Sequence, residues 1–174
     1  MAHEFHNVRI LGIDPGYGRV GWGVIEDKNG EWTHVAHGCI ETGANDPFVE
    51  RLLEIHARVK KLIQQYSPTR AGVEELFFYK NEKTAINVGQ ARGVILLTLS
   101  QAGLPVDECT PLEVKQSVVG YGRAEKRQVQ KLLQLRLRMR EMPTQDDAAD
   151  ALAVALTCAV SLRLKDIADS RSSA

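Results

Sequence analysis

Residues 8–42 read VRILGIDPGYGRVGWGVIEDKNGEWTHVAHGCIET, and this stretch decides the fold. Val8 to Asp14 is β-branched and apolar and stops at a Pro-Gly pair, which predicts a buried central strand. Arg19 to Asp27 and Glu31 to Thr42 predict two further strands. A hairpin turn joins them, because Asn29-Gly30 supports the positive φ angles that a tight turn needs. The stretch therefore predicts three strands connected as hairpins.

Downstream of the hairpin, predicted helices alternate with short strands. Asp46 is expected to cap a helix that begins at Pro47, and Thr110 with Glu113 predicts a capping box at a later helix start. Further strands are expected at 70–75 and 106–109, and further helices at 84–102, from 111, at 124–139 and at 145–164. We therefore expect an α/β domain whose five-stranded mixed sheet has three antiparallel and then two parallel strands, flanked by helices.

The composition fits one globular domain of 174 residues, with 44% hydrophobic and 25% charged residues. It excludes collagen-like and disordered classes, and no run of about 18 apolar residues predicts a membrane span. We expect a flexible extension at 1–7, a single domain at 8–164 and a polar tail at 165–174. Three cysteines without C-x-x-C spacing, and the lack of an apolar secretion signal, favour a cytoplasmic protein.

Charge is segregated along the chain although the net charge is zero. Between Glu113 and Arg140, eight basic residues stand against two acidic ones, which leaves this window at +6 and the remainder at −6. A basic region beside an acidic one is typical of a protein that holds a polyanion and also binds cations.

Gly16 to Gly21 matches the G-x-G-x-x-G dinucleotide fingerprint. That fingerprint needs a helix next, whose N-terminal N–H groups hold the pyrophosphate. The residues that follow, Trp22 to Ile25, are strand-like, and Asp14 would put a carboxylate beside the diphosphate. The pattern therefore disfavours a dinucleotide site.

Asp14 is instead a candidate catalytic group. It ends the buried central strand, at the carboxyl edge where open α/β sheets bind ligands. Glu74 and Glu75 end the fourth strand, and adjacent parallel strands bring their carboxyl ends together. Because side chains alternate along a strand, only one of these two glutamates can face Asp14. A turn aspartate with solvated edge glutamates is the alternative interpretation.

The last helix supplies two more carboxylates. Asp147 and Asp150 are three residues apart and share one helical face. Asp150 borders the apolar run ALAVALTCAV, where a carboxylate needs a partner such as a metal ion, whereas Asp146 is interpreted as a helix-start charge. Oxygen ligands suit Mg²⁺ or Mn²⁺, and two such ions can activate a water and stabilise the leaving oxygen of a phosphodiester. His34 and His37 are expected on opposite faces of a strand, so they offer no rival site.

Five motifs carry a family resemblance: LGIDPG (11–16), VEELF (73–77), GQARG (89–93), VKQSVVGYGRAEK (114–126) and DAADALA (147–153). In this order and spacing the chain resembles the RuvC family of Holliday junction resolvases. The resemblance implies a ribonuclease H-like fold and a homodimer that resolves four-way DNA junctions in recombination and repair by paired symmetric nicks. It further implies two Mg²⁺ ions per active site with Mn²⁺ as a substitute, products with 5′-phosphate and 3′-hydroxyl ends, and RuvA and RuvB as branch-migration partners.

The resemblance also implies roles for single residues. The catalytic and metal-binding carboxylates fall on Asp14, Glu74, Asp147 and Asp150. The junction-contacting lysines fall on Lys115 and Lys126, and the aromatic that stacks on bases falls on Phe77. Nearby aromatic and basic side chains extend the predicted DNA-binding set to Tyr79, Lys80, Lys83, Arg123 and Arg127. Phe78 is expected to be buried, and Arg136, Arg138 and Arg140 are expected to form a solvated helix end.

The predicted helix 84–102 is apolar on more than one face, which fits either packing against a second copy or a doubly buried core helix. Three other functions stay open from the sequence. They are a nuclease for RNA–DNA hybrids, an actin-like nucleotide-binding protein, which also opens with Asp-x-Gly, and a catalytically silent junction binder.

Overall fold

The computed structural model describes residues 8–76, 82–120 and 125–172. In these residues the strands are β1 (Arg9–Asp14), β2 (Arg19–Lys28), β3 (Glu31–Glu41), β4 (Arg70–Glu74) and β5 (Val106–Cys109). The helices are α1 (Phe48–Tyr66), α2 (Glu82–Gln101), α3 (Pro111–Val119), α4 (Lys126–Arg136) and α5 (Asp146–Ser172). None of the helices in the described ranges is long and apolar enough to cross a membrane.

The five strands form one mixed sheet in the order β3-β2-β1-β4-β5. β1 pairs antiparallel with β2, and β2 pairs antiparallel with β3. β4 joins β1 in parallel, and β5 joins β4 in parallel. The predicted arrangement of three antiparallel and two parallel strands is confirmed. The hairpin turn is confirmed too, since Asn29 and Gly30 have φ angles of 57° and 85°.

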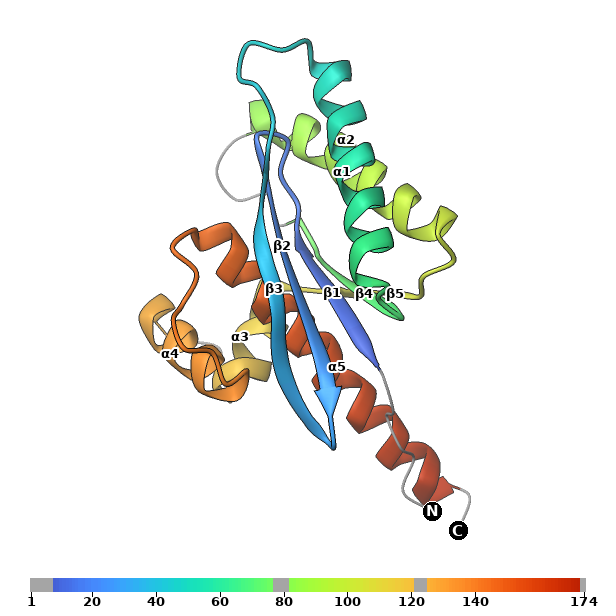
Figure 1. Ribbon diagram of the computed structural model, residues 1–174, viewed down its shortest axis with the longest axis vertical. Coiled ribbons are helices and arrows are strands. Elements are labelled where there is room, and N and C mark those ends of the chain that lie inside the picture. Colours follow the sequence, from blue (N-terminus) through green and yellow to red (C-terminus); the bar gives the residue numbers. More distant parts are fainter. Residues whose placement is uncertain (1–7, 77–81, 121–124, 173–174) are drawn as a thin grey trace.

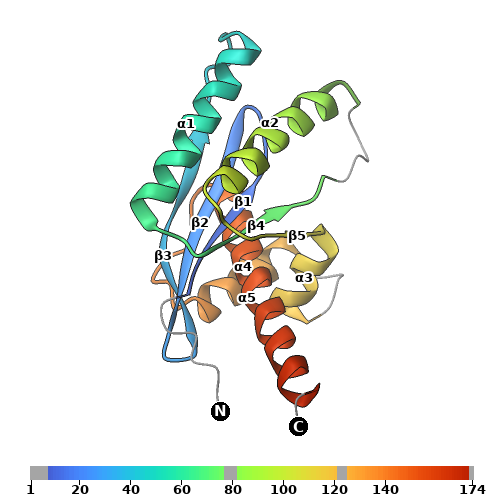
Figure 2. The ribbon, with the colours of Figure 1, turned by 90° about the vertical axis from the view of Figure 1, so that its right-hand side faces the viewer.

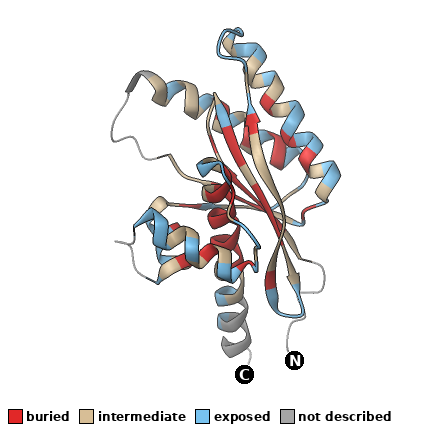
Figure 3. Ribbon diagram, turned by 60° about the vertical axis from the view of Figure 1, so that its left-hand side comes forward, coloured by how far each residue is buried: buried red, intermediate tan, exposed pale blue. Residues whose placement is uncertain are grey.

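Helices cover both faces of the sheet, with α1 and α2 on one face and α3, α4 and α5 on the other (Figures 1 and 2). Side chains alternate along β1, so Ile10 joins the core under α5, whereas Leu11 and Ile13 join the core under α1 and α2. The first half of α5 is buried almost throughout (Figure 3). The start of α5 is thereby fixed against the middle of the sheet.

Glycines let the backbone of α5 approach the sheet closely. A Cβ atom at Gly12 of β1 would collide with the carbonyl oxygen of Ala151, and one at Gly21 of β2 would collide with the carbonyl oxygen of Asp147. Because such contacts leave no room for any side chain, both positions require glycine. The two strands therefore set the depth of the first turns of α5.

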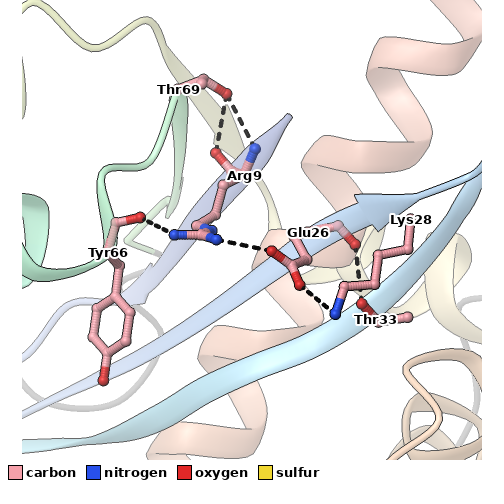
Figure 4. A network of polar contacts seen from close by, with 6 residues as sticks. All are labelled: Arg9, Glu26, Lys28, Thr33, Tyr66 and Thr69. Atoms are coloured by element: carbon pink, nitrogen blue, oxygen red, sulfur yellow. Dashed lines mark hydrogen bonds and ion pairs between the residues drawn. The ribbon is translucent and has the colours of Figure 1, made fainter. Parts of the chain in front are cut away.

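A polar network fastens the start of β1 far from the carboxyl ends of β1 and β4 (Figure 4). Arg9 donates from Nη2 to Glu26 Oε2 at 2.8 Å and from Nη1 to the carbonyl oxygen of Tyr66 at 2.5 Å. Lys28 Nζ lies 2.7 Å from Glu26 Oε1. Thr69 Oγ1 accepts from the amide of Arg9 at 3.2 Å and donates to its carbonyl oxygen at 3.1 Å. These contacts tie β1 to β2 and to the connection between α1 and β4.

The predicted N-terminal cap is present at α3 but not at α1. Thr110 and Glu113 form the predicted capping box at α3. The predicted Asp46 cap is wrong, because Pro47 is the N-cap of α1 and no side chain caps that helix. The amide of Asp46 instead donates to the carbonyl oxygen of Gly43, which closes a turn before the helix.

The ends of the last two helices also differ from prediction. α4 ends at Arg136 rather than at 139, and Arg138 has a φ of 52°. Arg136 Nη1 donates to the carbonyl oxygen of Ser117 at 2.6 Å, and Arg138 pairs with Glu31, so these two arginines are not merely solvated. α5 continues to Ser172, so its predicted end at 164 is wrong.

Candidate active site

Four carboxylates from three elements meet at the carboxyl edge of the parallel strands. Asp14 is the last residue of β1 and Glu74 the last of β4, and the two strands run side by side with Ile13 opposite Val73. The side chains of Asp14 and Glu74 are hydrogen-bonded to each other. The negative charges of Glu74, Asp150 and Asp147 all act on Asp14. The four carboxylates that the sequence proposed therefore lie close enough to interact.

Burial and mutual repulsion favour the protonated forms in this cluster. Burial raises the pKa of Asp14 to about 8, with further contributions from the charges of Glu74, Asp150 and Asp147. The pKa of Glu74 is also raised, first by burial and then by Asp150. The pKa of Asp150 is raised by burial, although the Lys126 ammonium opposes this shift. Asp14 and Glu74 thus hold a proton between them at neutral pH.

Two basic side chains partly balance the charge of the α5 carboxylates. Lys126 Nζ lies 3.4 Å from Asp150 Oδ2 and 3.3 Å from Asp146 Oδ2. Arg19 Nε lies 3.2 Å from Asp147 Oδ2, but Asp147 Oδ2 is buried and accepts no hydrogen bond. The Arg19–Asp147 contact is therefore an ion pair but not a hydrogen bond. A buried carboxylate oxygen that accepts no hydrogen bond and lies close to the carboxylates of Asp14 and Asp150 fits a metal cation.

The side chains as they stand do not yet form a metal cage. Among the residues that the structure describes, no three histidine, cysteine, aspartate or glutamate side chains are arranged to hold an ion. In place of a shared ion, the Asp14 and Glu74 side chains are hydrogen-bonded to each other, and Asp150 pairs with Lys126. Coordination by these carboxylates therefore requires side-chain movement, while their backbone positions are already set by strand ends and a helix start.

The neighbouring acids behave as helix-start and strand-end charges. Asp146 is 69% exposed and contacts Lys126 together with Gln130, whose Nε2 donates to Asp146 Oδ1 at 3.3 Å. Glu75 follows β4, and its amide donates to the carbonyl oxygen of Cys109. Glu75 is not among the groups that shift the pKa of Asp14. Of the two glutamates, Glu74 is the one that meets Asp14.

Several predicted DNA-binding residues lie outside the described residues. These are Phe77, Tyr79, Lys80 and Arg123, together with the side chain of Lys83. Phe78, which the sequence predicts to be buried, lies outside them too. Lys115 on α3 and Arg127 on α4 are exposed, and Lys126 reaches the carboxylates. The basic window of the sequence therefore borders the acidic cluster through α4.

Sequence reasoning missed two arginines. Arg19 opens β2 and pairs with Asp147, and its only signal was its place directly after the Gly-Tyr-Gly turn that follows Asp14. Arg92 of α2 donates from Nε to the backbone carbonyl of Glu74 at 3.1 Å and also pairs with Glu108. Arg92 lies in the GQARG motif, which marked the segment without indicating a contact.

The prediction for His34 and His37 is wrong, because β3 contains a register shift. On β2, Gly23 pairs with His37 and Val24 with Ala36. The next residue, Ile25, pairs with His34, so one residue of β3 is left without a partner on β2. The extra residue turns both histidines to the same side, where His34 Nε2 and His37 Nδ1 are 2.7 Å apart. Burial lowers the pKa of both imidazoles.

Comparisons with known proteins agree with one another. The model of the family described as "Crossover junction endodeoxyribonuclease RuvC" matches residues 10–158. The chain is 52% identical to such an enzyme from Petrotoga mobilis over 84% of this chain and 90% of that one, and 53% identical to one from Roseiflexus over 85% and 88%. The structure of Thermus thermophilus RuvC in complex with a Holliday junction substrate matches with a TM-score of 0.86 at 36% identity, covering 91% of this chain and 96% of that chain.

Proposed function

The chain belongs to the RuvC family of crossover junction endodeoxyribonucleases, and from this premise we propose that Asp14, Glu74, Asp147 and Asp150 form its catalytic, metal-binding centre. The family assignment and the ribonuclease H-like fold establish the reaction, which is cleavage of Holliday junction DNA. The observation that carries the residue assignment is the gathering of Glu74, Asp147 and Asp150 around Asp14, together with the buried Asp147 Oδ2 that accepts no hydrogen bond.

Members of this family use divalent metal, and the all-oxygen donor set here suits Mg²⁺, with Mn²⁺ as a substitute. Two such ions, held by the four carboxylates, would supply Lewis-acid stabilisation of the attacking and leaving oxygens of a phosphodiester. Hydrolysis of this kind leaves 5′-phosphate and 3′-hydroxyl ends. Asp14 and Glu74 would have to release their shared proton in order to bind a metal ion. Metal binding would therefore be coupled to deprotonation of this pair.

Exposed basic side chains beside the cluster are suited to hold the junction backbone. Lys115 and Arg127 are exposed on α3 and α4, and the Lys126 ammonium stands at the edge of the carboxylate cluster. Lysines and arginines bind phosphates by releasing condensed counterions. The proposed set extends to residues whose positions or side chains lie outside the described ranges: Phe77 by the family resemblance, and Tyr79, Lys80, Lys83 and Arg123 as aromatic or basic residues in or near the family motifs of the sequence.

An uncovered apolar face supports a homodimer. Val49 and Leu53 of α1 are 66% and 63% exposed, and Ile86 and Leu97 of α2 are 69% and 57% exposed. The inward face of α2 is buried at Ala91, Ile95 and Leu99, so this helix is apolar on two faces, as predicted. Paired nicks in opposed strands need two symmetry-related sites, which a two-fold dimer provides.

The dimer is tested by one charge placed on this face. Leu97→Glu should convert a dimer into a monomer in size-exclusion chromatography with light scattering. Leu164→Glu is the matched control, because Leu164 is 63% exposed on α5 and should leave the dimer intact. A Leu97→Glu protein of unchanged mass would exclude this face as the interface. The family also implies RuvA and RuvB as partners. We further propose that the chain acts in the cytoplasm.

The catalytic assignment is tested by cleavage of a labelled four-way junction with Mg²⁺, with linear duplex and RNA–DNA hybrid as competing substrates. Asp14→Asn, Glu74→Gln, Asp147→Asn and Asp150→Asn should each abolish cutting while junction binding survives. Asp146→Asn is the control from the same helix turn and should still cut. Preference for the hybrid would favour a ribonuclease, and unchanged cutting by Asp14→Asn would overturn the assignment.

A further inference from the structure

We propose that His34 and His37 form a second metal site, specific for a late first-row ion such as Zn²⁺ or Ni²⁺ and distinct from the carboxylate cluster. Both histidines belong to the edge strand β3. Their pocket is lined further by Thr33 and by residues 137–141, and none of the four carboxylates lines it.

The backbone presents the two imidazoles to each other. The register shift between β2 and β3 puts His34 opposite Ile25 and His37 opposite Gly23, which turns both rings to one side. The amide of His34 donates to the carbonyl oxygen of Leu137 at 3.1 Å, which fixes the strand against the segment after α4. The ring centroids are 4.9 Å apart at an interplanar angle of 48°. The register shift and the contact with Leu137 therefore place both rings on the same side of β3.

The nitrogen geometry is close to that of a chelated ion. His34 Nε2 and His37 Nδ1 face each other across 2.7 Å, so one of these nitrogens donates its N–H to the lone pair of the other. Two imidazole nitrogens bound to one zinc ion at about 2.0–2.1 Å are separated by roughly 2.9–3.4 Å at the usual bond angles. An opening of a few tenths of an ångström, which side-chain rotation supplies, makes room for a metal ion once the donating ring carries its proton on its other nitrogen, so that both facing nitrogens offer lone pairs.

The surroundings provide the remaining coordination sphere. The pocket measures about 380 Å³, which holds several water ligands. Glu141 also lines the pocket, but it is not arranged as a third ligand with the two histidines. Arg138 and Arg140 line the same pocket, but the guanidinium of Arg138 pairs with Glu31 of the hairpin. Two histidines are fewer ligands than a structural zinc site uses, so water must complete the sphere and the bound ion stays exchangeable.

Ligand chemistry separates this site from the catalytic one. Imidazole nitrogen suits Zn²⁺, Ni²⁺ and Cu²⁺, whereas the carboxylate cluster offers only oxygen. Excess Mg²⁺ therefore loads the carboxylates and leaves the histidine pair to a late transition metal.

The test is a Zn²⁺ titration of the full chain in excess Mg²⁺, followed by the side-chain nitrogen resonances of the five histidines. We expect the His34 and His37 resonances to shift together and to saturate at one ion per chain. The resonance of His56, whose Nδ1 bonds Thr98 Oγ1 at 2.8 Å, serves as the internal reference and should not move. The measurement needs no substitution, so it does not depend on how any variant folds.

Substitutions then test which histidines bind Zn²⁺. His34→Gln and His37→Gln should each weaken Zn²⁺ binding about tenfold or more, because the remaining imidazole loses its chelating partner. A His3→Ala/His6→Ala double variant is the control for the only other paired histidines in the sequence and should bind as before. Binding that disappears in that control, or His34 and His37 resonances that stay fixed at saturating Zn²⁺, would overturn the proposal. Failure of junction cleavage would not bear on it.

Discussion

The raised pKa of Asp14 means that this buried acid lowers the free energy of unfolding of the protein as the pH rises. Its pKa is about 8 in the folded chain and 3.8 as the ordinary value, so between these limits the native state keeps a proton that the unfolded chain has lost. The native state binds more protons in this window, and stability therefore falls as the pH rises through it and levels off above about pH 8. Each pH unit inside the window costs about 1.4 kcal/mol.

We expect Asp14→Asn to remove this cost. Asparagine is neutral at every pH and its amide can donate to Glu74, which already shares a hydrogen bond with position 14. Between pH 5 and pH 7, without metal, the variant should gain about 3 kcal/mol relative to the unsubstituted protein. Urea unfolding with EDTA at both pH values measures the gain. Asp146→Asn, at an exposed position of the same cluster, should show no comparable change.

Metal should then reverse the order of stability. Mg²⁺ binds only the folded carboxylate cluster, so it stabilises the unsubstituted protein by mass action and does so less for Asp14→Asn. Equal pH dependence of the two proteins without metal would refute the reasoning, since Asp14 would then be ionised in the folded state. The same result would remove the proton-sharing account of Asp14 and Glu74, while leaving the family assignment untouched.

Three further substitutions test what positions the site. Gly21→Ala should lower the free energy of unfolding, measured in urea, by about 1–3 kcal/mol and should lower kcat, because its Cβ would push the first turn of α5 away. Gly93→Ala is the control, since no atom lies within 4 Å of the added Cβ, and it should not destabilise the protein. Arg92→Ala should lower kcat about tenfold with junction Kd unchanged, because the carbonyl of Glu74 loses its donor, and a weaker Kd instead would assign Arg92 to DNA. Lys126→Ala should weaken junction binding and flatten its salt dependence by about one unit of slope in log Kd against log salt, and an unchanged slope would place Lys126 off the phosphates.

The carboxylate cluster was predictable because each member sits at a position that local rules define. Asp14 and Glu74 end parallel strands, whose carboxyl ends meet at one edge, and Asp147 and Asp150 follow from helical spacing at a helix start. Strand alternation alone left Glu74 and Glu75 open; the family resemblance pointed to Glu74, and the structure shows that Glu74 is the one that meets Asp14. The role of Phe77 rests on the family resemblance, and those of Tyr79, Lys80 and Arg123 rest on their aromatic or basic side chains, because residues 77–81 and 121–124 lie outside the described residues.

The errors came from contacts that local patterns do not encode. His34 and His37 would face opposite sides in a regular strand, and a one-residue shift against β2 reversed this. Asp46 carries a good capping side chain, yet the turn formed with Gly43 left Pro47 as the cap. The arginine at position 19 looked like an ordinary strand start, and its pairing with Asp147 arises only because β2 lies against α5.

In this site the backbone positions of the carboxylates are fixed, whereas the groups that balance their negative charge can be exchanged. The backbone positions of the carboxylates are set by strand ends and by the close approach of α5 to Gly12 and Gly21, which no side-chain motion alters. Their charges are balanced by a shared proton and by the basic residues Arg19 and Lys126. Each of these partners can leave, the proton to solvent and the basic side chains to phosphate. A polyanionic substrate that draws away the lysine therefore also frees a carboxylate for metal, so binding of junction and loading of metal favour each other through the same side chain.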